Sequence, residues 1–167
     1  MALPVRLYVD TNIFIRLFEA KGDVSEALAE LFLRAPRAAA PFLATSELTL
    51  AELLVGVFRQ RNDRLIDLYG TWANTNPYVE AGPVDRLILR SAAVLRARYG
   101  SLRLPDAIHL ATALHMRCSH LLTDDLKLRG TYELFNHHWG LTIGPAAVEI
   151  VRPDVEYVRA LAGAPPG

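Results

Sequence analysis

The sequence predicts an α/β fold with a mostly parallel central sheet, and two patterns support this. Short runs of strand-forming residues recur along the chain, and longer segments with apolar residues at helical spacing separate them. Strands that alternate with helices are joined by crossovers, and crossovers favour parallel pairing. Ligands of parallel sheets bind beyond the carboxyl ends of the strands, so chemistry is expected at those ends.

The first expected elements are one strand and two helices. Residues 6–9 (RLYV) form a strand-like run that stops at the polar trio 10–12 (DTN). Residues 13–20 repeat apolar side chains at helical spacing until Gly22 and Asp23 break the pattern. Ser25 is suited to cap a second helix, which Pro36 is expected to end.

A second strand and two more helices complete the first half of the chain. Residues 42–44 form a short apolar run, and Thr45 or Ser46 can cap the helix that follows. That helix is expected to reach about Arg59 and to turn four apolar residues inward, namely Leu50, Leu53, Leu54 and Val57. Residues 62–69 predict a further helix.

The second half repeats the alternation. Residues 73–77 (ANTNP) have the composition of a loop, and residues 85–99 predict a helix that Gly100 stops. Pro105 precedes a strong helical pattern at 107–117. The remaining expected elements are strands at 121–123 and 148–151 and a poorly ordered tail at 156–167.

Composition excludes several classes of protein. The 167 residues carry 18 Lys+Arg and 18 Asp+Glu, and 51% are hydrophobic, so the chain is not intrinsically disordered. Its size suits one domain, expected over residues 1–155. The zero net charge gives no sign of nucleic-acid binding, although segregated charges would escape this sum.

The lone cysteine and the hydropathy pattern bear on the compartment. Cys118 cannot form an internal disulfide, and it is expected to be a small buried side chain on a helix. No run reaches the roughly 18 apolar residues of a membrane-spanning helix, and the first residues lack a signal-peptide pattern. We therefore expect a cytoplasmic protein without a membrane anchor.

Acidic residues stand at the ends of the expected elements. Asp10 ends the first strand, Asp106 opens the helix after Pro105, and Asp124 and Asp125 follow the strand at 121–123. Clustered carboxylates repel one another unless they hold protons or a cation, and oxygen-only ligands favour Mg²⁺ or Mn²⁺. Such a cation makes water a nucleophile and stabilises charge on phosphate. The pattern indicates metal-dependent phosphodiester hydrolysis.

Each acid also has an ordinary structural alternative. Asp10 and Asp106 are suited to cap helices, and Asp124 and Asp125 are suited to a turn. Glu52 lies inside the helix after the second strand, where an acid usually occupies a solvated face. Spacing alone leaves both readings open.

Four segments together resemble the PIN-domain family. Residues 8–14 (YVDTNIF) resemble its opening motif, and residues 46–54 (SELTLAELL) its second, in which the late Glu is the acid. Residues 104–113 (LPDAIHLATA) and 121–125 (LLTDD) are similar to the third and fourth motifs. The motifs occur in the family order over residues 6–151, and VapC-type toxins of toxin–antitoxin pairs are the most similar branch.

The resemblance implies a three-layer α/β/α fold and an endoribonuclease that uses Mg²⁺ or Mn²⁺. It places catalytic, metal-binding acids at Asp10, Glu52, Asp106 and Asp125. It also implies that Asn12 orients Asp10 and that Thr123 is a hydroxyl donor behind the acids. Asp124 matches a variable position and ranks below Asp125 as a metal ligand, although either could contact a metal through water. Implied partners are substrate RNA, a cognate antitoxin and a second copy of the chain.

Two parts of the chain depart from the compact pattern of the family. The stretch from Arg59 to Leu104 is long, and the chain continues past the last expected strand. The apolar faces at Phe14, Phe18, Leu31 and Phe32 are expected to meet an antitoxin peptide or a second copy.

Basic residues gather where acids are absent. Sixteen of the 18 basic residues are Arg, and residues 86–103 contain five Arg and no acid. Arg90, Arg96 and Arg98 are the candidates for binding the RNA backbone. The alternative is a solvated helix face.

Other functions remain open from the sequence. A catalytically inactive PIN-like module that binds RNA or protein would share the fold, but its expected mark would be lost acids. A non-toxin nuclease of RNA processing would keep the acids. A phosphohydrolase of small substrates is a third possibility, and the absence of a Gly-rich phosphate loop disfavours a nucleotide-binding version of it.

Overall fold

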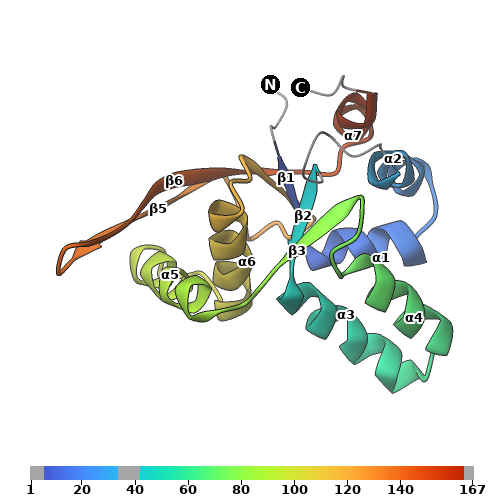
Figure 1. Ribbon diagram of the computed structural model, residues 1–167. Coiled ribbons are helices and arrows are strands. Elements are labelled where there is room, and N and C mark those ends of the chain that lie inside the picture. Colours follow the sequence, from blue (N-terminus) through green and yellow to red (C-terminus); the bar gives the residue numbers. More distant parts are fainter. Residues whose placement is uncertain (1–5, 34–41, 164–167) are drawn as a thin grey trace.

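A six-stranded sheet with helices on both faces forms the body of the protein (Figure 1). The computed structural model describes residues 6–33 and 42–163. The strand order is β3-β2-β1-β4-β6-β5, and every neighbouring pair is parallel except β5 with β6. The strands are β1 (Leu7–Val9), β2 (Leu43–Ser46), β3 (Val79–Gly82), β4 (His120–Leu122), β5 (Thr131–His138) and β6 (Leu141–Val151). The expected mostly parallel α/β fold is confirmed.

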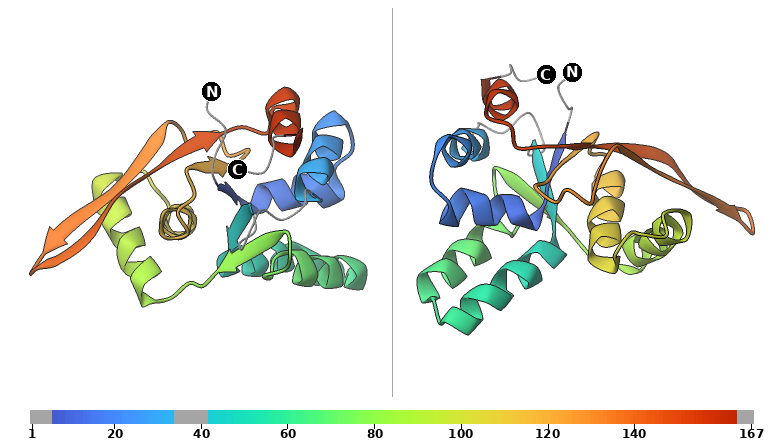
Figure 2. Two further views of the ribbon diagram at one scale, coloured as in Figure 1. Left: turned by 45° about the horizontal axis from the view of Figure 1, so that its top comes forward. Right: turned by 180° about the vertical axis from the view of Figure 1, so that it is seen from behind.

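Alternation along β1 divides the interior into two cores. Leu7 and Val9 pack into one core, and Tyr8 packs into the other, because successive side chains of a strand point to opposite faces. The first core takes side chains from α1 (Thr11–Glu19), α2 (Asp23–Phe32), α3 (Glu47–Gln60), α4 (Asp63–Trp72) and α7 (Val155–Gly163). The second takes them from α5 (Arg86–Arg98) and α6 (Leu104–His115). Figure 2 shows the two groups of helices on opposite sides of the sheet.

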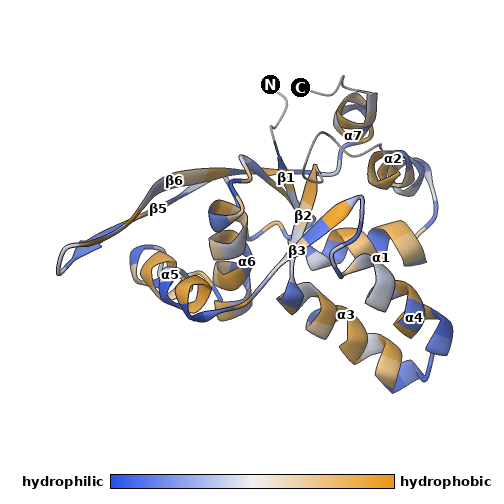
Figure 3. Ribbon diagram, in the orientation of Figure 1, coloured by the Kyte–Doolittle hydropathy of each residue, from blue (hydrophilic) through white to orange (hydrophobic). Residues whose placement is uncertain are grey.

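Local signals explain where the helices begin. Asp10, Ser46, Asn62 and Asp85 each accept a hydrogen bond at the first turn of the following helix, as expected of N-caps. The apolar and polar residues of each helix lie on different sides, so hydrophobic and hydrophilic colours alternate along the ribbons (Figure 3). The helix expected at 107–117 begins earlier, at Leu104, because Pro105 fits its first turn.

The largest departure from the sequence expectations is the β5–β6 hairpin. The sequence predicts only a strand at 148–151, whereas β6 begins at Leu141 and pairs with β5 along an arm that projects from the body (Figure 1). Trp139 and Gly140 form its two-residue turn, and both have positive φ, as a twisted hairpin requires. Strand β3, at the opposite edge of the sheet, is also absent from the sequence expectations.

The expectation of a poorly ordered tail from residue 156 is wrong for residues 156–163. They belong to α7, whose Val158 and Leu161 are buried against the first core. Pro36 and residues 164–167 lie outside the described part of the chain, so the expectations placed on them are not examined by the structure.

The apolar faces assigned to a partner are instead interior. Phe14, Leu31 and Phe32 are buried in the first core, and Phe18 packs partly against it. The expectation that they form a surface for an antitoxin or a second copy is wrong because α7, which the sequence does not predict, packs against α2. Cys118 is buried as expected, but it follows α6 instead of lying on it.

None of the described helices is both long enough and apolar enough to cross a bilayer.

Candidate active site

Asp10 lies at the centre of the carboxyl edge of the sheet, between β1 and α1. Asp10 is only 8% exposed to solvent. One carboxylate oxygen, Oδ1, accepts a hydrogen bond from the backbone N–H of Thr11 at 2.7 Å, which caps α1. The helix-capping role and a site role therefore coexist in one side chain, with the second oxygen left for other groups.

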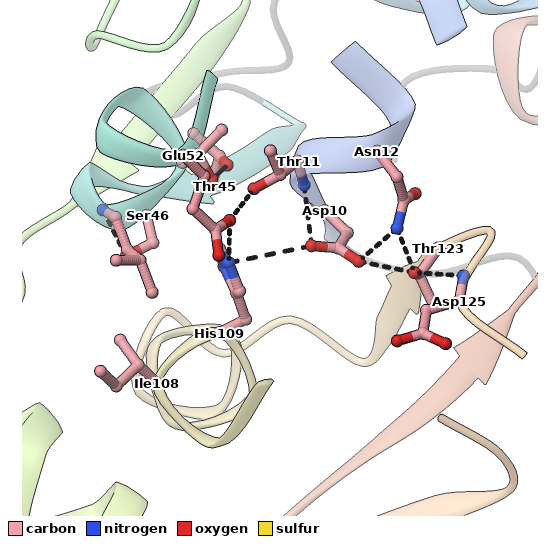
Figure 4. Close-up of polar contacts among 12 residues, drawn as sticks. Asp10, Thr11, Asn12, Thr45, Ser46, Glu52, Ile108, His109, Thr123 and Asp125 are labelled. Atoms are coloured by element: carbon pink, nitrogen blue, oxygen red, sulfur yellow. Dashed lines mark hydrogen bonds and ion pairs between the residues drawn. The ribbon is translucent and has the colours of Figure 1, made fainter. Parts of the chain in front are cut away.

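Asn12 and Thr123 hold the second oxygen of Asp10. The Asn12 amide donates to Oδ2 at 2.7 Å, and the Thr123 hydroxyl donates to the same atom at 2.6 Å. Thr123 Oγ1 in turn accepts from the Asn12 amide and from the backbone N–H of Asp125. One hydroxyl thus links the ends of β1 and β4, as Figure 4 shows.

Glu52 reaches the site from the second turn of α3. Its Oε2 accepts a hydrogen bond from the Thr11 hydroxyl and lies 3.0 Å from Nε2 of His109. Burial acts to raise the pKa of Glu52, but the hydrogen bond and charge of His109, with the Thr11 hydroxyl, outweigh it and lower that pKa. Glu52 is therefore held ionised, and its Oε1 makes no hydrogen bond to the described residues.

His109 connects Glu52 to Asp10 from α6. Its Nε2 lies 3.8 Å from Oδ1 of Asp10, and its Nδ1 lies 2.7 Å from the buried hydroxyl of Tyr8. Burial acts to lower the pKa of His109, yet the Glu52 hydrogen bond and the charges of Asp10, Glu52 and Asp106 raise it overall. The neighbouring carboxylates therefore favour the protonated form of the imidazole.

Asp106 and Asp125 bring two more carboxylates to the same edge. Asp106 lies in the first turn of α6, and Asp125 follows β4. Partial burial raises the pKa of Asp106, and the charges of Asp125 and Asp10 raise it further. Asp125 and Asp10 therefore each repel Asp106, and a cation at this edge would relieve that repulsion.

Asp124 has a different neighbour. Its carboxylate lies 2.6 Å from Nη1 of Arg16 on α1, and its backbone N–H donates to Oδ1 of Asn12. The charge of Asp124 is not among those that raise the pKa of Asp106. The lower rank of Asp124 among the candidate ligands stays a prediction. A pocket of about 410 Å³ adjoins the pair and is lined by Asn12, Ile15, Arg16, Glu19, Ala20 and Asp124.

The three candidate RNA-binding arginines lie on α5, which packs against α6. All three are exposed. Arg96 donates to the Leu102 carbonyl, and Arg98 forms an ion pair with Glu133 of β5 at 2.7 Å. Arg90 lines a shallow pocket at the start of α5. Their role toward RNA stays a prediction.

The donor chemistry of the site fits a hard cation. Its acids offer only oxygen ligands, which Mg²⁺ and Mn²⁺ prefer. Among the described residues, however, no three acidic, His or Cys side chains stand in a geometry that would hold an ion together. A cation at this edge would therefore need the carboxylates to converge by side-chain adjustment.

The structure adds residues that the sequence analysis did not select. Thr11 holds Glu52, Tyr8 fixes His109, and Arg16 holds Asp124. The sequence does indicate a place for His109 near the acids, because it follows Asp106 by three residues on one helix. The partners of Tyr8 and Arg16 are about a hundred residues away in sequence, so no local pattern reveals them.

Known proteins supply an independent comparison. The family model described as "PIN domain" matches residues 7–134. A search of curated protein sequences found no match. Among solved structures, a chain of a toxin–antitoxin complex from Klebsiella pneumoniae is 27% identical, with a TM-score of 0.54 over 73% of this chain and 88% of that one.

A second solved structure has the same fold at lower identity. It is VapBC2 from Rickettsia felis bound to a promoter DNA fragment, 18% identical, with a TM-score of 0.52 over 72% of this chain and 89% of that one. The family match covers most of the chain and includes Asp10, Glu52, Asp106 and Asp125. The chain belongs to the PIN-domain family.

Proposed function

We propose that this protein is an endoribonuclease that depends on Mg²⁺ or Mn²⁺ and acts as the toxin of a type II toxin–antitoxin pair. The observation that carries the proposal is the gathering of Asp10, Asp106 and Asp125 at one edge of the sheet, where burial and the charges of Asp125 and Asp10 raise the pKa of Asp106. Uncompensated acids are costly unless a cation joins them. Membership of the PIN-domain family supports the same reading.

Asp10, Glu52, Asp106 and Asp125 would hold the cation, with Asp124 in an outer position. A bound Mg²⁺ or Mn²⁺ lowers the pKa of water and stabilises charge on the scissile phosphate. The chain's own residues keep the ligands in place. Asn12 and Thr123 fix Asp10, and Thr11 with His109 keeps Glu52 ionised at neutral pH.

The RNA backbone would bind beside this acidic edge through arginines. Arg90, Arg96 and Arg98 are the proposed contacts because they are exposed on an acid-free helix. Such contacts neutralise phosphate charge and make affinity fall with salt. Charge reversal at Arg90 and Arg98 together should weaken RNA binding and flatten its salt dependence.

Similarity to a toxin–antitoxin complex supports an antitoxin partner and a toxin role. We propose that the protein also forms a homodimer and acts in the cytoplasm, where its RNA substrate and antitoxin would be found. Expression of the wild-type protein alone should arrest growth, whereas expression of Asp10→Asn should not. Growth arrest by both proteins would contradict a toxin role that depends on cleavage.

Cleavage of RNA by the purified protein tests the enzymatic part. Wild type should cleave single-stranded RNA with Mg²⁺ or Mn²⁺ and should stop in EDTA. Asp10→Asn should lose cleavage while it keeps the wild-type circular dichroism spectrum. Asp67→Asn, an exposed acid on α4, is the matched control and should behave as wild type. Undiminished cleavage by Asp10→Asn, or in EDTA, would refute the mechanism.

A further inference from the structure

Arg152 stands beside the site, although it lies beyond the region that the family model matches. It follows the last residue of β6, next to Thr123 at the end of β4. The backbone N–H of Thr123 donates to the Val151 carbonyl at 3.1 Å, so the two strand ends are joined directly. The family match ends at residue 134, and it therefore assigns no role to this arginine.

The guanidinium of Arg152 binds three backbone carbonyls of the loop that carries Asp125. Its Nη1 donates to the Thr123 and Asp125 carbonyls, each at 2.8 Å. Its Nη2 donates to the Leu128 carbonyl. A planar guanidinium offers several donors in a fixed arrangement, so one side chain ties residues 123, 125 and 128 together.

The backbone of Arg152 is itself anchored. Its carbonyl accepts a hydrogen bond from the N–H of Asp154 at 2.8 Å, and the Asp154 carboxylate then accepts from the first turn of α7. Helix α7 is fixed by Val158 and Leu161 in the first core. The C-terminal helix therefore supports the position from which Arg152 reaches the loop.

The bonds from Arg152 add to those that the loop makes within itself. Local bonds also hold the loop, from Asp125 N–H to Thr123 Oγ1 and from Leu128 N–H to the Asp125 carbonyl. The Arg152 side chain adds three bonds that tie this backbone to the residue following β6.

We propose that Arg152 is a positioning residue that holds Asp125 ready to bind the divalent cation. This inference rests on the proposed function, since it assigns Asp125 a cation. Outer groups that orient metal ligands commonly change metal affinity or activity by about 10- to 100-fold when they are altered. Lysine cannot replace arginine here because an ammonium group lacks the planar fork that spans three carbonyls.

The test compares wild type with Arg152→Lys, which keeps the charge, and with Arg152→Gln, which keeps an amide donor. Arg159→Met is the matched control, because Arg159 is exposed on α7 and makes no bond to the loop. Mn²⁺ binding is measured by calorimetry. Amide hydrogen exchange at residues 124–128 is measured without metal, and RNA cleavage is measured as a function of Mg²⁺ concentration.

We expect Arg152→Lys to weaken Mn²⁺ binding about 10- to 100-fold and to raise the Mg²⁺ needed for half-maximal cleavage similarly. Amides 124–128 should exchange faster, while KM for RNA at saturating Mg²⁺ stays near the wild-type value. If Arg152→Lys does not fold, Arg152→Gln should give the same pattern. Arg159→Met should match wild type in every measurement.

Mn²⁺ affinity and loop exchange within twofold of wild type in both Arg152 variants would overturn the proposal. A wild-type protein that binds no Mn²⁺ would overturn it as well. A wild type that binds Mn²⁺ but cleaves no RNA would refute the proposed function alone, because weaker Mn²⁺ binding by Arg152→Lys would still support the positioning role.

Discussion

The imidazole Nε2 of His109 lies 3.0 Å from Oε2 of Glu52, which joins α6 to α3 across the carboxyl edge of the sheet. Glu52, like Asp106, lies within a helix, so no strand end positions it directly. Its place in the site depends on His109 and on the Thr11 hydroxyl. These two contacts hold the carboxylate of Glu52 within the candidate cation site.

Loss of the Tyr8 hydroxyl should loosen His109. In Tyr8→Phe, Nδ1 of His109 loses its buried hydrogen bond, which should cost about 1–3 kcal/mol of unfolding free energy. Urea denaturation measures the change. Tyr132→Phe is the control, because the Tyr132 hydroxyl makes no hydrogen bond to the described residues, and it should change stability little. Equal losses in both variants would contradict this account of Tyr8.

Asp106→Asn should stabilise the metal-free protein at neutral pH. The pKa of Asp106 is raised in the folded state, so ionisation costs stability as pH rises from the unfolded value, about 4, through the folded value. Thermal unfolding in EDTA should show the gain at neutral pH and its disappearance below about pH 4. Added Mg²⁺ should reverse the order and favour wild type. A variant that is less stable than wild type in EDTA at neutral pH would argue against repulsion among the acids.

Cys118 should be inert toward thiol reagents in the folded protein. Burial raises the pKa of its thiol to about 12, so almost no thiolate forms at neutral pH. Alkylation by iodoacetamide should proceed in denaturant and be undetectable on the same time scale in buffer. Modification of the native protein at the rate of a free thiol would show that the second core opens around α6.

The hairpin arm should place one tryptophan in water. Trp139 is 89% exposed at the turn, whereas Trp72 packs against Phe18, Phe32 and Tyr78. In Trp72→Phe, the remaining tryptophan emission should resemble that of the free amino acid and be quenched readily by acrylamide. Blue-shifted, protected emission would mean that another molecule covers the arm.

The sequence predicted the sheet-forming core because β1, β2 and β4 are short buried runs bounded by polar residues. The hairpin escaped prediction because most of β5 and the outer part of β6 are exposed and present no regular apolar face. Helix α7 carries apolar residues at helical spacing, but the flanking Pro and Gly residues suggested a frayed tail. Local sequence patterns could not show that α7 packs against α2.

The sequence predicted the acids of the candidate site better than it predicted the residues that hold those acids in place. Asp10 and Asp125 follow strands, and parallel strands bring their carboxyl ends to one edge. Thr11, Tyr8 and Arg152 act through contacts that span between 24 and 101 residues in sequence, so only the folded chain reveals them. Arg152, which follows β6, thus supports a candidate site whose acids all lie within the first 125 residues.

The most direct test of the central claim is a calorimetric titration of Mn²⁺ into wild type and Asp106→Asn, with RNA cleavage measured on the same samples. The account predicts that wild type binds Mn²⁺ and cleaves RNA, and that Asp106→Asn loses both properties while it remains folded. RNA cleavage by Asp106→Asn at the wild-type rate, or by wild type without a bound divalent cation, would contradict it.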